Sequence, residues 1–188
     1  MADSLLFMLL GMALVLGALW AKARFWSFTS QTPQDYEKGA PQFDLREHLN
    51  GPILCEGVIY GPLGRVTSRF VGKFEARWDG NRGVMREHFI YDSGATQDRE
   101  WRLEIGNDGQ IKADADDLVT PGSGQMSGSA VQLKYRIRLP EESGGHVLDT
   151  VDWMYLAPNG TVMNRSQFRK FGIPVAELVA TMRKVDAA

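Results

Sequence analysis

The stretch from Val66 to Asp79 alternates between two kinds of side chain along its whole length. Successive side chains of a β-strand point to opposite faces of a sheet, so this alternation predicts one long strand with a buried face and a wetted face. Such a division is typical of an antiparallel sheet that is buried on one side. The largely apolar face is Val66, Ser68, Phe70, Gly72, Phe74, Ala76 and Trp78, and the largely polar face is Thr67, Arg69, Val71, Lys73, Glu75, Arg77 and Asp79.

Similar stretches, separated by Gly, Asp and Asn turns, recur from Ile53 onward. The predicted strands are 53–60, 65–79, 83–91, 97–106, 109–115, 126–139, 148–157 and 161–171. The glycine-rich stretch 121–130 is expected to be a flexible turn or a loop at the barrel mouth. Eight strands with short connections favour an antiparallel up-and-down barrel, because closure leaves no unpaired strand edge.

Helical patterns flank these strands. Pro174 suits the first turn of a helix, and Val175, Leu178, Val179 and Met182 form an apolar stripe after it, so a C-terminal helix is expected. A short helix around 44–49 should precede the first strand. The predicted fold is therefore mainly β: an eight-stranded, lipocalin-like (calycin) barrel with a C-terminal helix and an N-terminal transmembrane helix. A barrel of eight strands is just wide enough to be filled by its own side chains or to hold one small ligand.

The chain begins with an apolar segment, and Leu5–Trp20 contains no charged residue. The residues before it carry no positive charge, unlike the start of a signal peptide, so we expect an uncleaved single-span anchor. Trp20, Phe25 and Trp26 would lie at its interfacial exit. The predicted organisation is a transmembrane anchor over 1–26, a polar linker over 27–42 that lifts the domain off the bilayer, and a barrel domain with its C-terminal helix over 43–188.

Composition excludes several classes of function. The chain has 188 residues and a formal net charge of −2, which gives no sign of a nucleic-acid footprint. Cys55 is the single cysteine and the three histidines are scattered, so neither a disulfide framework nor a metal site is indicated. No cofactor is expected.

Two hairpins can be placed in register from their turns. A two-residue Asn159-Gly160 loop would set Tyr155 opposite Asn164 and Trp153 opposite Ser166. On that register the inner face is Val151, Trp153, Tyr155, Ala157, Val162, Asn164, Ser166 and Phe168, and the wetted face is Asp152, Met154, Leu156, Met163, Arg165, Gln167 and Arg169.

The second hairpin places a charged pair. A three-residue Asp92-Ser93-Gly94 loop sets Glu87 opposite Arg99 and Met85 opposite Trp101, with both charged groups inside among aromatic side chains. Another register would put them outside. An internal pair can fix the register, anchor the head group of an amphipathic ligand, or supply a catalytic carboxylate, and no second catalytic group is evident beside it.

Several short motifs, "EHFIYDSG…REW", "GSA…Y", "DWMYL" and "NRSQFRKFGIPVAEL", make the chain from Phe43 onward resemble the bacterial DUF3833 family, whose members are often lipoproteins. The matching residues are Glu87, Phe89, Arg99, Trp101, Trp153, Asn164, Lys170, Phe171 and Gly172. The resemblance implies an envelope location and a gene that often lies near genes for fatty-acid-modifying enzymes of the cyclopropane-synthase type. This chain departs from the lipoprotein pattern, because it has an apolar anchor in place of a lipid-accepting Cys. The resemblance favours a single-pass inner-membrane protein with a periplasmic barrel, whereas Lys22 and Arg24 after the span favour the cytoplasmic side.

These observations lead to three hypotheses. The first is a membrane-tethered barrel that binds a fatty acid, a phospholipid or another hydrophobic ligand. The second is a filled barrel that meets an envelope protein through basic residues such as Arg165, Arg169 and Lys170. The third is an enzyme on lipid chains with Glu87 as its acid. The candidate interior residues are Phe70, Phe74, Trp78, Glu87, Phe89, Tyr91, Arg99, Trp101, Tyr135, Trp153, Tyr155, Asn164, Ser166 and Phe168.

Overall fold

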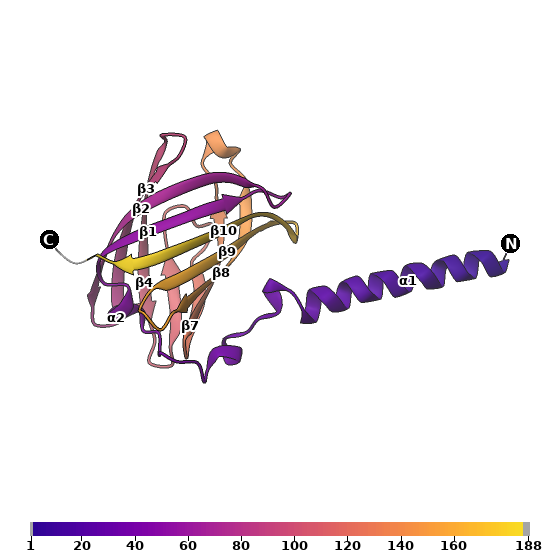
Figure 1. Ribbon diagram of the computed structural model, residues 1–188, viewed down its shortest axis with the longest axis horizontal. Helices are drawn as coiled ribbons and strands as arrows, with labels where there is room; N and C mark the ends of the chain where they lie inside the picture. The colour runs from indigo at the N-terminus through magenta and orange to yellow at the C-terminus, as the bar shows by residue number, and fades with distance from the viewer. Residues whose placement is uncertain (1, 186–188) are drawn as a thin grey trace.

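A closed antiparallel barrel dominates the computed structural model, which describes residues 2–185 (Figure 1). Each strand pairs with the next along the chain, and the last returns to pair with the first. The strands are β1 (Gly51–Tyr60), β2 (Val66–Asp79), β3 (Arg82–Tyr91), β4 (Thr96–Ile105), β5 (Gln110–Asp114), β6 (Gly122–Ser127), β7 (Ala130–Arg138), β8 (Val147–Leu156), β9 (Val162–Lys170) and β10 (Ile173–Lys184). The helices are α1 (Ala2–Phe25), α2 (Leu45–His48) and the 3-10 helices η1 (Phe28–Ser30), η2 (Pro33–Tyr36) and η3 (Glu141–Ser143).

The up-and-down topology agrees with the prediction, but the strand count of eight is wrong because the barrel has ten. The two additional strands are β6 and β10. The first lies in the glycine-rich stretch that was expected to be a turn or loop, and the second replaces the expected C-terminal helix.

Close packing against β7 explains the glycines of β6. A Cβ atom on Gly124 would lie 2.3 Å from the carbonyl oxygen of Gln132, and one on Gly122 would lie 2.9 Å from that of Lys134. Real Cβ atoms do not approach so closely. Glycine in this strand therefore marks a close backbone approach.

Barrel closure decides the conformation of β10. Its residues pair with β9 on one side and with β1 on the other, for example Leu178 with Ser166 and with Ile59. Ala180 and Met182 are buried by the same alternation. A helix here would leave the facing edges of β1 and β9 unpaired, so tertiary pairing outweighs the helical spacing of the apolar residues.

The short helix before β1 is present and closes one end of the barrel. The Asp44 side chain accepts a hydrogen bond from the backbone of Arg46 at 2.9 Å and caps the helix. Leu45 and Leu49 are buried in the barrel end, and Trp78 Nε1 donates to the Leu49 carbonyl at 2.8 Å. The helix is therefore an apolar plug, and a partly buried hydrogen bond from Trp78 helps to hold it.

The polar segment between the helix and the barrel lies against the barrel wall. We call residues 28–42 the strap. Tyr36 of the strap packs on the rings of Trp153 and Tyr155, with centroid separations of 5.2 and 5.3 Å. Phe43 donates its backbone N–H to Gly128 at 2.8 Å at the end of the strap. The strap is thus packed on the barrel and is not an extended spacer.

The N-terminal helix leaves the barrel in one direction (Figure 1). Its stretch Asp3–Phe25 has a mean hydropathy of 2.2, and none of it is buried in the protein. By length and composition it can cross a membrane, and a signal sequence near an N-terminus has the same properties.

Candidate ligand site in the barrel interior

The β8–β9 hairpin turns through three residues, so the two-residue loop predicted for it is wrong. Ala157 N–H donates to Thr161 at 2.8 Å, and Gly160 adopts a φ of 82°. Pairing then shifts by one residue, with Met154 opposite Asn164 and Asp152 opposite Ser166. A one-residue slip moves a whole strand face to the other side of the sheet.

The slip reverses β8 and leaves the predicted faces of β9 unchanged. Trp153 and Tyr155, expected inside, lie on the outer face beneath the strap, while Asp152 and Met154, expected on the wetted face, point into the barrel. Trp153 is fully buried, and the ring of Tyr36 packs on it. The Tyr155 hydroxyl donates to Gln31 of the strap at 2.8 Å. These two aromatics hold the strap and do not line the interior.

The β3–β4 register is the predicted one. Glu87 pairs with Arg99 and Met85 with Trp101, around a three-residue turn with Gly94 at a φ of 85°. Both charged side chains line the interior cavity. The barrel therefore carries a carboxyl group and a guanidinium within its aromatic wall.

Arg99 has a carboxylate partner other than Glu87. Its Nη2 donates to Asp117 at 3.0 Å, and its Nε lies 2.8 Å from the second Asp117 oxygen but outside hydrogen-bonding geometry. The guanidinium stacks over Trp101, 4.0 Å from the ring centroid. Asp117 follows β5, so this pair joins the wall at β4 to the segment after β5. Arg99 is thereby fixed with one flat face on an aromatic ring.

Glu87 is left without a full set of partners. Its Oε2 atom is buried and has no hydrogen-bond partner among the described residues. Burial raises the pKa of Glu87 to about 7, although the positive charge of Arg99 opposes the rise. The interior thus holds a carboxyl group whose pKa lies near neutral pH.

Asp152 is a polar residue of the cavity wall that the predicted register placed outside. Ser166 donates to it at 2.8 Å and Asn164 also donates, while the Tyr135 hydroxyl lies 3.5 Å away. Burial raises its pKa, against the lowering effect of the Ser166 and Asn164 hydrogen bonds. Pro158 carried the missed signal, because proline favours the second position of a type I turn and so a longer loop.

These groups face one cavity of about 120 Å³. Its polar lining is Glu87, Arg99, Tyr135, Asp152, Asn164 and Ser166, and its apolar lining is Leu45, Leu49, Cys55, Phe70, Phe74, Met85, Phe89, Trp101, Leu103, Leu133, Ile137, Met154, Phe168, Leu178 and Met182. Besides Trp153 and Tyr155, two further predicted interior residues are not in this lining. Trp78 packs against the core beside the α2 plug, and Tyr91 is half-buried at the opposite end.

A cluster of aromatic side chains lies between the polar groups and the end opposite α2. Phe89 packs edge-on against Phe70 and Phe74 at centroid separations of 5.3 and 5.1 Å, and it stacks with Tyr91 at 6.2 Å. Phe89, Tyr91 and Phe168 are only half-buried. We call these three residues the rim.

The described residues include no group of three or more His, Cys, Asp or Glu side chains placed to hold a metal ion. Cys55 lines the cavity, and burial raises the pKa of its thiol. The interior therefore contains a cluster of polar side chains around Glu87 and Asp152, next to the aromatic cluster around Phe89.

Comparison with known proteins agrees with this architecture. The sequence matches the family described as "Protein of unknown function (DUF3833)" over residues 23–184, which includes the strap as well as the barrel. The chain belongs to the DUF3833 family. No curated protein matches it.

Solved structures similar to this DUF3833 protein show its fold. An S-type phycobiliprotein lyase, CPES from Guillardia theta, is 9% identical with a TM-score of 0.59, over 84% of this chain and 99% of the lyase. Rv2717c from M. tuberculosis is 13% identical with a TM-score of 0.55, over 79% of this chain and 99% of its own. The DUF3833 chain is therefore a lipocalin-like barrel.

Proposed function

We propose that this protein is a membrane-anchored barrel that binds a lipid or a similar amphipathic ligand, with the polar end of the ligand at Glu87. The observation that carries the proposal is the buried Oε2 atom of Glu87, which has no hydrogen-bond partner among the described residues, on a side chain that lines the cavity. Leaving a buried polar group unpaired costs about 1–3 kcal/mol, more for a charged one, so such a position favours a ligand that supplies the missing bond.

The chemistry of the cluster indicates what that polar end should carry. Glu87 and Asp152 offer carboxyl oxygens, and the raised pKa of each favours the protonated form that can also donate. Arg99 is already paired with Asp117 and is not a free anion site. A polar end with both hydrogen-bond donors and acceptors, such as a hydroxyl, an ester or a protonated carboxyl group, fits this environment best.

The volume limits how the ligand sits. The cavity of about 120 Å³ is well below the ~300–1,000 Å³ of drug-sized ligand pockets. It accommodates a polar end and not a whole acyl chain. The rest of a fatty acid or phospholipid would have to lie among the half-buried rim residues, which would have to move apart.

The test uses the full-length chain purified in mild detergent. Native mass spectrometry should show co-purified lipid, and a fluorescent fatty acid should bind the delipidated protein. Glu87→Gln should weaken binding by up to about tenfold, because an amide cannot reproduce both hydrogen bonds of a protonated carboxyl group and one such bond contributes ~0.5–1.5 kcal/mol. Glu104→Gln, a change on the half-exposed outer face of β4, is the matched control and should bind as the unaltered chain does. Absence of both co-purified lipid and uptake would refute the proposal.

The small cavity also favours a second candidate, a filled barrel that acts through its outer surface in the cell envelope. Its basic residues are only partly available: Arg165 is held by Glu177 at 2.9 and 3.0 Å, and Arg169 donates to Gly172 at 2.7 Å. Lys170 remains on this surface beside His146. Charge reversal at Lys170 should then remove an envelope partner from a pull-down, and an unchanged set of partners would count against this candidate.

A further inference from the structure

Two neighbouring hairpins expose large apolar side chains. Leu63 in the β1–β2 turn is 84% exposed, Phe171 in the β9–β10 turn is 91% exposed, and Ile173 beside it is 65% exposed. The two turns lie side by side because β1 pairs with β10. We call Leu63, Phe171 and Ile173 the apolar tips. Clustered exposed apolar groups usually mark an interaction surface.

The anchor helix is tied closely to the barrel that bears these tips. The helix ends at Phe25, and Phe28 already lies under the guanidinium of Arg165 on the outer face of β9, 4.6 Å from it. Three residues can span at most ~11 Å. A membrane that holds α1 therefore lies directly against the barrel.

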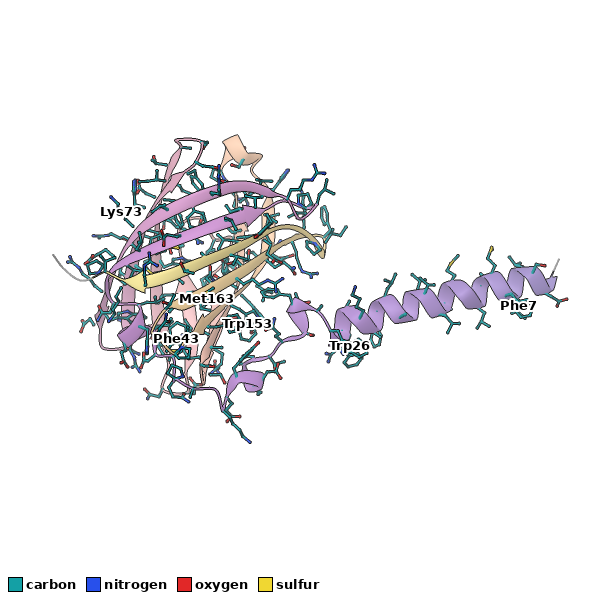
Figure 2. All side chains as sticks on the ribbon, viewed as in Figure 1. Phe7, Trp26, Phe43, Lys73, Trp153 and Met163 are labelled. Carbon is teal, nitrogen blue, oxygen red and sulfur yellow. The ribbon has the colours of Figure 1, made fainter. Side chains whose placement is uncertain are left out.

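The tips lie on the side of the barrel that would meet that membrane. Figure 1 shows that the β1–β2 and β9–β10 turns reach furthest in the direction in which α1 leaves the barrel. Trp26 lies at the exit of the helix on the same side (Figure 2). The odd-numbered strands all end on this side of the barrel, opposite the end that α2 closes. The half-buried rim residues lie near the ends of β3 and β9, so they are on the same side as the tips.

The side chains beside the tips suit the surface of a bilayer. Arg65 adjoins the first turn and Lys170 the second, and long basic side chains keep their charge at the lipid head groups while their stems lie on apolar surface. Between the turns lies a groove of about 340 Å³ with Pro62 and Pro174 in its walls. Apolar tips with basic neighbours are typical of an interfacial contact.

We propose that the apolar tips insert into the interfacial layer of the bilayer that holds α1, and that they dock the end of the barrel that bears the rim residues on its membrane. The docking rests on the membrane anchor of the proposed function. A lipid could then pass from the bilayer to the polar cluster around Glu87 once the rim residues move apart.

Nitroxide labels on single cysteines test the docking in the full-length chain, reconstituted in vesicles of phosphatidylcholine and phosphatidylglycerol. The labelled variants are Leu63→Cys and Phe171→Cys at the tips, Leu10→Cys in the helix, and Asn159→Cys at the far end of the barrel. Cys55 is buried, so the unaltered chain gives the background. Depth is read from the ratio of relaxation by oxygen, which concentrates in lipid, to relaxation by a water-soluble nickel chelate.

The tip labels should be at least severalfold more accessible to oxygen relative to nickel than the Asn159 label, with the Leu10 label deeper still. Tip labels that match the Asn159 label, with a deep Leu10 label, would overturn the docking and leave the anchor standing. A Leu10 label that is exposed to water would overturn both the docking and the membrane anchor. Lipid retention, measured on the same samples by native mass spectrometry, reports separately on the ligand site.

Discussion

Replacing Glu87 by Gln should change how stability depends on pH. The folded pKa of Glu87 is about 7, above its ordinary value of 4.5, because the side chain is buried. Between pH 4.5 and about pH 7, Glu87 loses its proton in the unfolded chain but keeps it in the folded barrel. The free energy of unfolding of the unaltered protein should therefore fall as the pH rises from about 4.5 to 7, and the loss is complete above that range.

The magnitude follows from the two pKa values. At ~1.4 kcal/mol for each pH unit, the rise from 4.5 to about 7 corresponds to about 3 kcal/mol of lost stability. Glu87→Gln keeps the shape of the side chain and removes the titration. The variant should thus be more stable than the unaltered protein at pH 8, by up to that amount, and within about 1 kcal/mol of it at pH 5. Asp152 contributes a residual slope of the same sign because its pKa is also raised.

Urea titrations at half-unit steps from pH 5 to 8, followed by near-UV circular dichroism in detergent, measure these free energies. Glu104→Gln provides the control and should retain the slope of the unaltered protein. An equal pH slope in Glu87→Gln and the unaltered chain would refute the assignment of Glu87 as a buried group with a raised pKa. The assignment would also be refuted if Glu87→Gln itself lost about 3 kcal/mol of unfolding free energy between pH 5 and pH 8.

Three further substitutions test the packing around the site. Tyr36→Ala should cost about 3 kcal/mol of unfolding free energy, because it removes a large aromatic side chain that covers two other rings, and limited proteolysis should then cut the strap first. Gly124→Ala should reduce the yield of folded protein or cost more than ~2 kcal/mol, since its Cβ would lie 2.3 Å from a backbone oxygen, whereas Gly80→Asn in an open left-handed turn should cost less than about 1 kcal/mol in the same urea assay. Trp78→Phe should lower the unfolding free energy by about 1–3 kcal/mol, because the Leu49 carbonyl loses its donor, and hydrogen exchange at α2 should accelerate.

Local chemistry predicted the β3–β4 half of the site. Gly94 in the third position of the turn fixed a three-residue loop, and that loop placed Glu87 opposite Arg99 inside the barrel. The same kind of turn joins β8 to β9, where Asn159-Gly160 alone indicated a shorter loop. One residue of difference in a loop was enough to place Asp152 on the wrong face.

The partners of the charged groups could not be predicted. Arg99 binds Asp117, which lies 18 positions further along the chain in a segment without strand pattern. The strap shows the same limitation, because its polar composition hides Tyr36, whose contacts with Trp153 and Tyr155 exist only after β8 and the strap meet. Contacts between distant segments depend on the closed barrel.

By itself the sequence determined the mainly β fold, the antiparallel meander, the plug helix at 44–49 and the apolar N-terminal helix. Each of these follows from the side-chain period or capping chemistry of one continuous segment. The tertiary structure decided what depends on pairing. It made the amphipathic end of the chain into β10, because β1 and β9 each needed a partner, and it made the glycine-rich stretch into β6, because only glycine fits against β7. It also decided which face of β8 meets the cavity, since the face follows from the register and the register from the geometry of a single turn.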